Sequence, residues 1–195
     1  MLILFSIPSQ AQDHSQLQQL LSPFSGIPHI KLAYQEKRFS IFFKQPRLYQ
    51  GTIEYISPDT LIKSVETPDR KKFVLQQNTL SIYEHNIEPD DTSDPINKVS
   101  LDDYPQLKQL KTLFIALFQG DTDQLVKFYQ YKIHHLANNT TRLVLKSLLN
   151  NPLIDDIPSS LSKQQIDIVF QHQRIIKILM KGLGGERSEV IFNYE

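Results

Sequence analysis

Hydrophobic and polar residues alternate through most of residues 34–86, which predicts a run of short antiparallel strands. In residues 49–56 the odd positions are Tyr, Gly, Ile and Tyr, while most of the even positions are polar. Proline-containing turns and a Gln-Asn-Thr turn then separate three further predicted strands, which are residues 61–67, 72–76 and 80–83. A meander of this kind buries one face and exposes the other to water.

The strand predicted before this meander, residues 30–43, changes its pattern halfway. Apolar residues lie at even positions up to Tyr34 and at odd positions from Phe39 to Phe43. We expect a β-bulge or bend near residues 36–38, because one extra residue would bring both sets to the same face.

Apolar residues at 3–4 spacing predict three amphipathic helices, at residues 13–23, 104–119 and 121–129. The second is the longest, with Asp102 or Asp103 available as its cap and Gly120 at its end. It carries a broad stripe of leucine and phenylalanine, so it must cover another apolar surface.

Further strands are predicted at residues 131–136, 142–148, 166–171, 175–179 and 189–194. The total is about eleven strands and three helices, which makes a mainly β chain of the α+β class. The apolar surfaces of sheet and helices have two ordinary outcomes. Either they close on each other as a solid core, or they enclose a cavity for an apolar ligand.

The length and charge of the chain narrow its function. Its 195 residues fit a single domain. Lys and Arg number 21 and so do Asp and Glu, so no net charge is available to hold a polyanion, and we expect no nucleic-acid partner. Cysteine is absent, which excludes disulfides and thiolate chemistry.

The sequence contains no recognisable catalytic or metal-binding set. The six histidines lack ligand spacing, and His134 and His135 are adjacent on a predicted strand, so they point to opposite faces. The acidic segment 87–100 lacks the framework of a calcium loop, and no nucleophile elbow or phosphate loop occurs. We therefore expect no enzyme activity, no metal and no cofactor.

The N-terminus favours export from the cytoplasm. Residues 1–7 are apolar and are followed by Pro-Ser-Gln-Ala-Gln, which suits signal-peptidase cleavage after Ala11. The positively charged start of a signal peptide is missing, so a disordered or buried N-terminal strand is the alternative. On the export interpretation the chain divides into a signal peptide, residues 1–11, and one domain, residues 12–195.

Several short motifs follow one another in a particular order: Tyr34-Gln35-Glu36-Lys37, Gly51-Thr52-Ile53-Glu54-Tyr55, Ser57-Pro58-Asp59, Pro68-Asp69 and Asn78-Thr79-Leu80-Ser81-Ile82-Tyr83. In this order they resemble the LolA-like periplasmic carriers of outer-membrane lipoproteins, and residues 143–146 and 185–192 resemble the later strands of that family. The resemblance spans most of the chain. One departure is Ser57, where the best-known carriers have an arginine that ties the lid shut by hydrogen bonds.

The resemblance implies an incomplete antiparallel β-barrel of about eleven strands, LolA/LolB-like, in which helices cover a hydrophobic cavity. It implies a periplasmic carrier or chaperone that shelters the acyl chains of lipoproteins or lipids on their way to the outer membrane. Its partners would be the acylated lipoprotein or lipid cargo, an inner-membrane exporter and an outer-membrane receptor, and we expect a monomer.

Aliphatic and aromatic side chains suit such a cavity, because each methylene kept from water is worth about 0.8 kcal/mol. The residues expected to line it, from the sheet and from the long helix, are Phe39, Ile41, Tyr55, Leu61, Val65, Phe73, Leu75, Leu80, Ile82, Leu110, Phe114 and Leu117. Two alternatives stay open. One is a module of the same fold that binds a cell-envelope glycolipid or assists export, and the other is a lipid-acting enzyme.

Overall fold

A computed structural model describes residues 10–84, 94–148, 164–182 and 186–194. The α-helices of this part of the chain are α1 (Gln10–Leu21), α2 (Pro105–Gln119) and α3 (Thr122–Phe128). Its strands are β1 (His29–Phe39), β2 (Arg47–Ile56), β3 (Thr60–Thr67), β4 (Lys71–Gln76), β5 (Thr79–Glu84), β6 (Asn97–Ser100), β7 (Tyr129–Leu136), β8 (Thr140–Ser147), β9 (Gln165–Gln171), β10 (Arg174–Lys181) and β11 (Arg187–Asn193).

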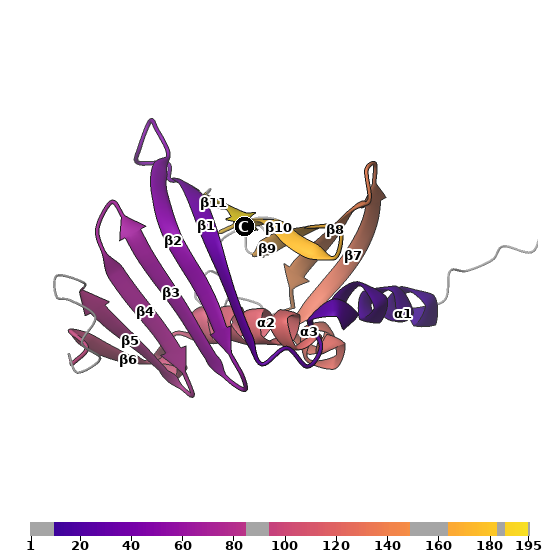
Figure 1. Cartoon of the computed structure of the whole chain (residues 1–195), viewed down its shortest axis with the longest axis horizontal. Helices are drawn as coiled ribbons and strands as arrows, with labels where there is room; N and C mark the ends of the chain where they lie inside the picture. The colour runs from indigo at the N-terminus through magenta and orange to yellow at the C-terminus, as the bar shows by residue number, and fades with distance from the viewer. Residues whose placement is uncertain (1–9, 85–93, 149–163, 183–185, 195) are drawn as a thin grey trace, which may run out of the picture.

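The strands form one antiparallel sheet in the order β6-β5-β4-β3-β2-β1-β11-β10-β9-β8-β7. The sheet curves around α2, which lies across one end of the strands, and α1 lies on the side of β7 (Figure 1). Since β6 and β7 occupy opposite ends of this order, the curved sheet is an unclosed barrel. The prediction of an incomplete antiparallel barrel of about eleven strands with helices is therefore confirmed.

Cross-strand pairing aligns the apolar positions of the meander on the concave face. Tyr55 lies opposite Leu61, Leu61 opposite Leu75, and Leu75 opposite Leu80. Because side chains alternate between the faces with period two, this single row fixes the direction of the other residues in β2 to β5. Alternation in the sequence was sufficient to predict this part of the fold.

The expected bulge in the first strand is wrong. β1 pairs without interruption with both β2 and β11, and it ends at Phe39, so Ile41 and Phe43 lie in the turn that follows. Even positions face the concave side along the whole strand, including the polar residues Glu36 and Arg38. The inward polar pair is tolerated because its charges neutralise each other, as described below.

The predicted helices are present, although the start of α2 differs from the expectation. Gly120 ends α2 in the left-handed conformation, with φ of 67°, and the Asp121 carboxylate caps α3 by accepting from the Gln124 amide at 2.9 Å. Asp102 and Asp103 do not cap α2, because they form a separate 3₁₀ turn that is capped by Ser100.

Two predictions fall partly or wholly outside the described residues. Residues 1–9, most of the expected signal peptide, are not described, and α1 begins at Gln10, so it includes the expected cleavage position after Ala11. Of the acidic segment 87–100, the last four residues form β6, which pairs with β5. None of the described helices combines the length and apolar character needed to cross a bilayer.

The helices fill only one half of the concave face. Side chains of α1, α2 and α3 pack against β7 to β11 in a dense core whose fully buried members include Leu17, Leu21, Leu113, Leu117, Leu143, Ile166 and Ile168. On the other half, most residues of β3, β4 and β5 are only half-buried. The β2–β5 half of the sheet is therefore incompletely covered.

Gly51 allows β2 and β3 to approach each other closely at an irregularity in their pairing. A Cβ atom on Gly51 would lie 1.8 Å from the Ser64 carbonyl oxygen, whereas one on Gly182 would meet nothing closer than 3.6 Å. We predict that Gly51→Ala lowers the free energy of unfolding by about 2 kcal/mol or more, because backbone must move to admit the methyl group. Urea denaturation measures this change, and equal stability of Gly51→Ala and the control Gly182→Ala would contradict it.

A helix-covered apolar cavity as the candidate functional site

A cavity of about 600 Å³ lies between α2 and the concave face of the sheet. This volume is within the range of roughly 300–1,000 Å³ found for small-molecule pockets. Six of its lining residues carry charge and the remainder are aliphatic or aromatic. The apolar lining residues are Tyr49, Ile53, Leu61, Ile62, Val65, Phe73, Leu75, Leu80, Leu107, Leu110, Phe114, Ile178, Met180, Val190 and Phe192.

The cavity brings together seven of the twelve residues expected from the sequence, which are Leu61, Val65, Phe73, Leu75, Leu80, Leu110 and Phe114. The other five lie elsewhere. Tyr55 and Leu117 belong to the dense core, with 1% and 0% of their surface exposed. Phe39 ends β1 and Ile41 is 69% exposed in the turn after it, while Ile82 is half-buried on β5 without lining the cavity.

Some lining residues were overlooked although the sequence contained a signal for them. Tyr49 and Ile53 lie at odd positions of β2, on the same strand face as Tyr55, and Leu107 precedes Leu110 by one helical turn. Ile178, Val190 and Phe192 could not have been found in this way, because they reach the cavity only through the pairing of β1 with β11 and of β11 with β10.

α2 separates the cavity from the dense core, because its two sides meet different surroundings. Leu113, Leu117 and Phe118 are fully buried in the core. Leu107, Leu110 and Phe114 face the cavity, and Phe114 also stacks on Phe118 at a ring distance of 6.2 Å. The wide apolar stripe predicted for this helix therefore has two functions, since one part fills the core and the other roofs the hollow.

The charged lining residues are almost all basic. Arg38, Arg47, Lys63, Lys71 and Lys111 are cationic, and Asp69 is the one carboxylate among the lining residues of the described chain. Lys111 belongs to α2, whereas Arg38 and Arg47 are paired at the far end of β1 and β2. The cavity thus runs from an apolar end beneath α2 to a basic end beside the β1–β2 turn.

A buried carboxylate, Glu36, organises the basic residues next to the cavity. Its side chain is 2% exposed. It accepts hydrogen bonds from Arg38 Nε at 3.0 Å and Ser188 Oγ at 2.7 Å. Its other oxygen accepts from Lys63 Nζ, which also lies 4.8 Å from the centre of the Tyr34 ring. One carboxylate therefore serves two cations, and the cluster keeps one positive charge.

The charge of this cluster shifts the pKa of Glu36. Burial alone would raise the pKa of its carboxyl, but the positive charge of Lys63 and the hydrogen bonds from its three partners outweigh burial and lower the pKa to about 2. Burial also lowers the pKa of the Lys63 ammonium, although Glu36 opposes this shift. Glu36 is consequently ionised over the whole physiological pH range.

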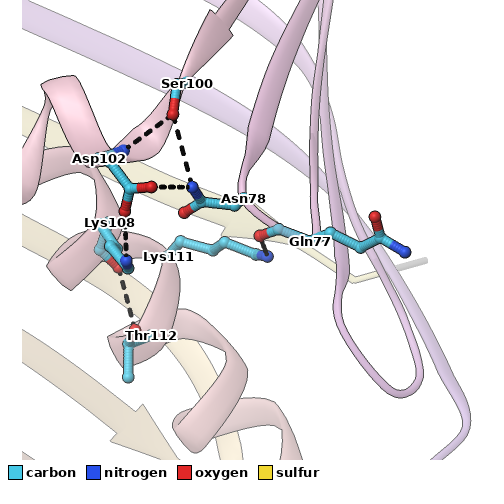
Figure 2. Close-up of polar contacts among 7 residues, drawn as sticks. All are labelled: Gln77, Asn78, Ser100, Asp102, Lys108, Lys111 and Thr112. Atoms are coloured by element: carbon cyan, nitrogen blue, oxygen red, sulfur yellow. Dashed lines mark hydrogen bonds and ion pairs between the residues drawn. The ribbon is translucent and has the colours of Figure 1, made fainter.

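α2 is attached to the turns at the adjacent end of the sheet. The Lys111 ammonium, 6% exposed, donates to Asp59 Oδ2 at 2.7 Å and to the Gln77 carbonyl at 2.5 Å. Figure 2 shows Lys111 reaching from the helix to Gln77 in the β4–β5 turn. At the end of the helix, Gln119 donates to Tyr55 Oη at 2.9 Å and to the Pro58 carbonyl at 2.8 Å.

A second set of contacts fixes the approach to α2. Figure 2 shows Asn78 donating to Asp102 at 2.6 Å, and Lys108 of the helix donating to the same carboxylate at 2.7 Å. This pair is solvent-exposed, so it contributes little to stability by itself. The buried Lys111 attachment is the stronger connection between helix and sheet. Asp59 lies two residues after Ser57, the position where the resemblance implied an arginine.

A second hollow, of about 800 Å³, lies between α1 and the turns that follow β7 and β9. It is larger than the first cavity, but glutamine, asparagine, threonine and histidine side chains provide much of its lining. His135 is among them, while His134 points to the other face of β7. Within the described ranges no three His, Asp or Glu side chains are grouped so that they could hold a metal ion.

The fold and the cavity together define an unclosed antiparallel barrel with a helix-roofed apolar pocket, and solved structures of related architecture exist. The superposition with a LolA superfamily protein from Nitrosomonas europaea covers 93% of this chain and 91% of that protein, with 10% sequence identity and a TM-score of 0.46. The superposition with LprF from Mycobacterium bovis covers 96% of this chain and 94% of LprF, with 10% sequence identity and a TM-score of 0.39. The superposition with a chain of the MucA/MucB complex of Pseudomonas aeruginosa covers 92% of this chain and 55% of that chain, with 11% sequence identity and a TM-score of 0.43.

A LolA superfamily protein is thus among the solved structures that this chain is similar to, as the motifs in the sequence implied. No family model matches the sequence, and no curated protein matches it. Because the TM-scores lie below 0.5, the functional proposal below is based on the chain's own cavity.

We predict that Glu36→Gln lowers the free energy of unfolding at pH 7 by about 2 kcal/mol, because Lys63 and Arg38 lose their shared carboxylate. Ionisation of Glu36 stabilises the fold fully above pH 4.5, the pKa of a free glutamate, and this contribution is lost as the pH falls towards 2. The difference between wild type and variant should therefore shrink in acid. Urea denaturation at several pH values tests this, with substitution of the exposed Glu84 by Gln as the control. A stability difference between wild type and Glu36→Gln that does not change with pH would show that ionised Glu36 does not stabilise the fold.

We also predict that Asp59→Ala loosens α2. Lys111 would then keep a buried charge with only a carbonyl partner, which is costly. Amide hydrogen exchange in the middle of α2 should become about tenfold faster, whereas Asp102→Ala, which breaks the exposed pair with Lys108, should have little effect. Equal exchange in both variants would mean that Lys111 does not fasten the helix.

Proposed function

We propose that this protein is a carrier that shelters the acyl chains of a lipoprotein or lipid in the cavity beneath α2. The observation that supports this function best is the apolar hollow of about 600 Å³, roofed by Leu107, Leu110 and Phe114 and walled by the sheet. A solid core would have left no space for a guest. The cavity instead exposes aliphatic and aromatic side chains that gain from covering a hydrocarbon chain.

The energy available from such a cavity is sufficient for transport. Ten methylenes moved from water into it would contribute about 8 kcal/mol, at about 0.8 kcal/mol each. Part of this gain is offset by the ordering of the chain and the loss of its free motion. A net affinity below this gross gain would suit a carrier, because cargo must be held in transit and still be surrendered to a stronger acceptor.

The charges around the cavity fit an amphiphile better than a plain hydrocarbon. Its apolar end lies beneath α2, and its basic end has Arg38 and Arg47 opposite each other on neighbouring strands. A hydrocarbon tail would occupy the first region, and the polar part of the cargo would remain at the second. Release then requires that α2 moves away from the turns that hold it, or that a receptor competes for the tail.

We place this activity in the periplasm of a cell with an outer membrane, where the N-terminal export signal expected from the sequence would deliver the chain. Cargo would arrive from an inner-membrane exporter and leave to an outer-membrane receptor. In this scheme the protein binds and releases without chemistry, so it is not an enzyme.

We predict that Phe114→Glu abolishes uptake of an apolar fluorescent probe such as N-phenylnaphthylamine, since a carboxylate in the apolar lining would have to be desolvated. Thr112→Glu is the matched control, because it adds the same charge to α2 outside the cavity lining. Fluorescence titration of both folded variants gives the answer. Normal uptake by Phe114→Glu would remove the cavity from the proposal.

The native cargo is identified by mass spectrometry of the protein purified from its own host. Acylated protein or lipid recovered intact supports a carrier. Turnover of an added lipid ester that disappears with one Ser or His substitution would instead establish the enzyme that the sequence left as an alternative.

A further inference from the structure

The turn between β1 and β2, together with the start of β2, carries the largest group of exposed hydrophobic residues in the described chain. Ile41, Phe42, Phe43 and Leu48 are 69%, 81%, 49% and 61% exposed. They are four of the ten large hydrophobic residues found exposed in that part of the protein, and the other six are scattered over separate elements. A compact apolar group of this kind, unlike single exposed residues, indicates a contact surface.

The turn projects from the molecule. In Figure 1 it extends beyond the neighbouring strand turns, at the end of the sheet away from α2. Its shape is fixed by local hydrogen bonds, because the Phe43 amide donates to the Ser40 carbonyl at 3.2 Å and the Phe42 amide donates to Ser40 Oγ at 3.3 Å. The apolar side chains are thus presented at the end of a defined turn, and we call residues 41–48 the β1–β2 tip.

The tip itself carries the cations Lys44 and Arg47 and no acidic residue, while Arg38 at its base is paired with Glu36 and Lys37 lies opposite Glu189 of β11. Residues 37–48 contain four cations, Lys37, Arg38, Lys44 and Arg47, and no Asp or Glu, although the whole chain has no net charge. Among the described residues, no carboxylate lies within ion-pair distance of Lys44 or Arg47. The Arg47 guanidinium instead lies over the Phe43 ring at 4.0 Å, and Arg187 of β11 lies over Phe39 at the same distance.

The tip adjoins the basic end of the cavity. Arg38 and Arg47, which are paired at the base of the turn, both line it, and Tyr49 continues the lining along β2. Whatever surface the tip contacts is therefore brought next to the basic end of the cavity.

We propose that the β1–β2 tip docks the protein on the surface of a bilayer that contains anionic phospholipids. Exposed aromatic and aliphatic residues enter the boundary between headgroups and acyl chains, and surrounding Lys and Arg side chains are attracted to anionic headgroups. The tip matches both properties of this one partner. A protein partner would more commonly offer directional polar groups or a mixture of charges, neither of which this tip is built to meet.

Docking in this orientation would place the basic end of the cavity at the membrane, so that an acyl chain could move between bilayer and cavity with little exposure to water. The proposal extends the carrier function, but its test does not depend on the cavity. Flotation with phosphatidylcholine vesicles, with and without phosphatidylglycerol in a ratio of roughly 7:3, measures docking directly. We expect binding to the anionic vesicles alone, and weaker binding as salt is added.

Three kinds of variant test the residues. The double substitution Phe42→Ser with Ile41→Ser should abolish binding, while Ile96→Ser, an exposed apolar residue elsewhere, should leave it unchanged. Lys44→Gln with Arg47→Gln should weaken it roughly 25-fold, at about fivefold for each cation near an anionic surface. Lys31→Gln with Lys146→Gln, which removes two exposed lysines elsewhere, should have little effect.

A direct readout comes from Phe42→Trp, because the chain contains no tryptophan. Its fluorescence should shift to the blue with anionic vesicles and be quenched by brominated lipid, while Tyr104→Trp should show neither effect. The double variant Ile41→Ser with Phe42→Ser, which lies outside the cavity lining, should keep probe uptake, and Phe114→Glu should keep docking, so the two proposals can fail separately. Absence of vesicle binding by the wild-type chain, or equal loss in control and tip variants, would overturn the docking proposal and leave the tip as a protein-binding surface.

Discussion

The structure depends on a mismatch of area between the sheet and the helices that cover it. Eleven antiparallel strands present a continuous concave face, whereas only α2 and shorter helices are available to fill it. α1 and α3 add their side chains on the β7–β11 side, which becomes densely packed. On the β2–β5 side α2 alone covers the apolar surface, so apolar walls remain without a matching filling. The cavity follows from this uneven distribution.

The polar contacts of α2 maintain that distribution. Gln109 donates to the Phe128 carbonyl and to Ser147 on the packed side, and Lys111 reaches Asp59 and Gln77 on the hollow side. These contacts hold the helix against both halves of the sheet, so that it does not collapse into the cavity. The Glu36 cluster has a comparable effect at the other end, because it keeps charged side chains ordered where the wall would otherwise be apolar.

Much of the fold could be predicted from the sequence, because it rests on local patterns. Alternation identified the strands of the meander, and Gly120 and Asp121 marked the junction between α2 and α3. The path of β1 was predicted wrongly, since the aromatic residues from Phe39 to Phe43 suggested a buried strand. The structure instead buries Glu36, whose partner Lys63 lies on a strand two places away in the sheet, and no local pattern reveals such a partner.

Some cavity residues could likewise be predicted from local patterns, and others depended on contacts between residues distant in sequence. Phe73, Leu75 and Leu80 followed from alternation, because residues on one strand face share their surroundings. Tyr55 and Leu117 have the same pattern and yet belong to the solid core, since the division between core and hollow depends on which side of α2 each residue lies. Val190 and Phe192 depended on the pairing of the last strand with the first, which is set by the closing of the whole sheet.

The open edges of the barrel bear on the range of cargo. A closed barrel has a diameter fixed by its strand number and stagger, so its interior cannot widen unless backbone hydrogen bonds break. Here β6 and β7 stand at opposite ends of the strand order, and the curvature of the sheet can change while every strand keeps its neighbours. The width of the hollow is therefore set by side-chain packing, which would let the proposed carrier adjust to acyl chains of different thickness.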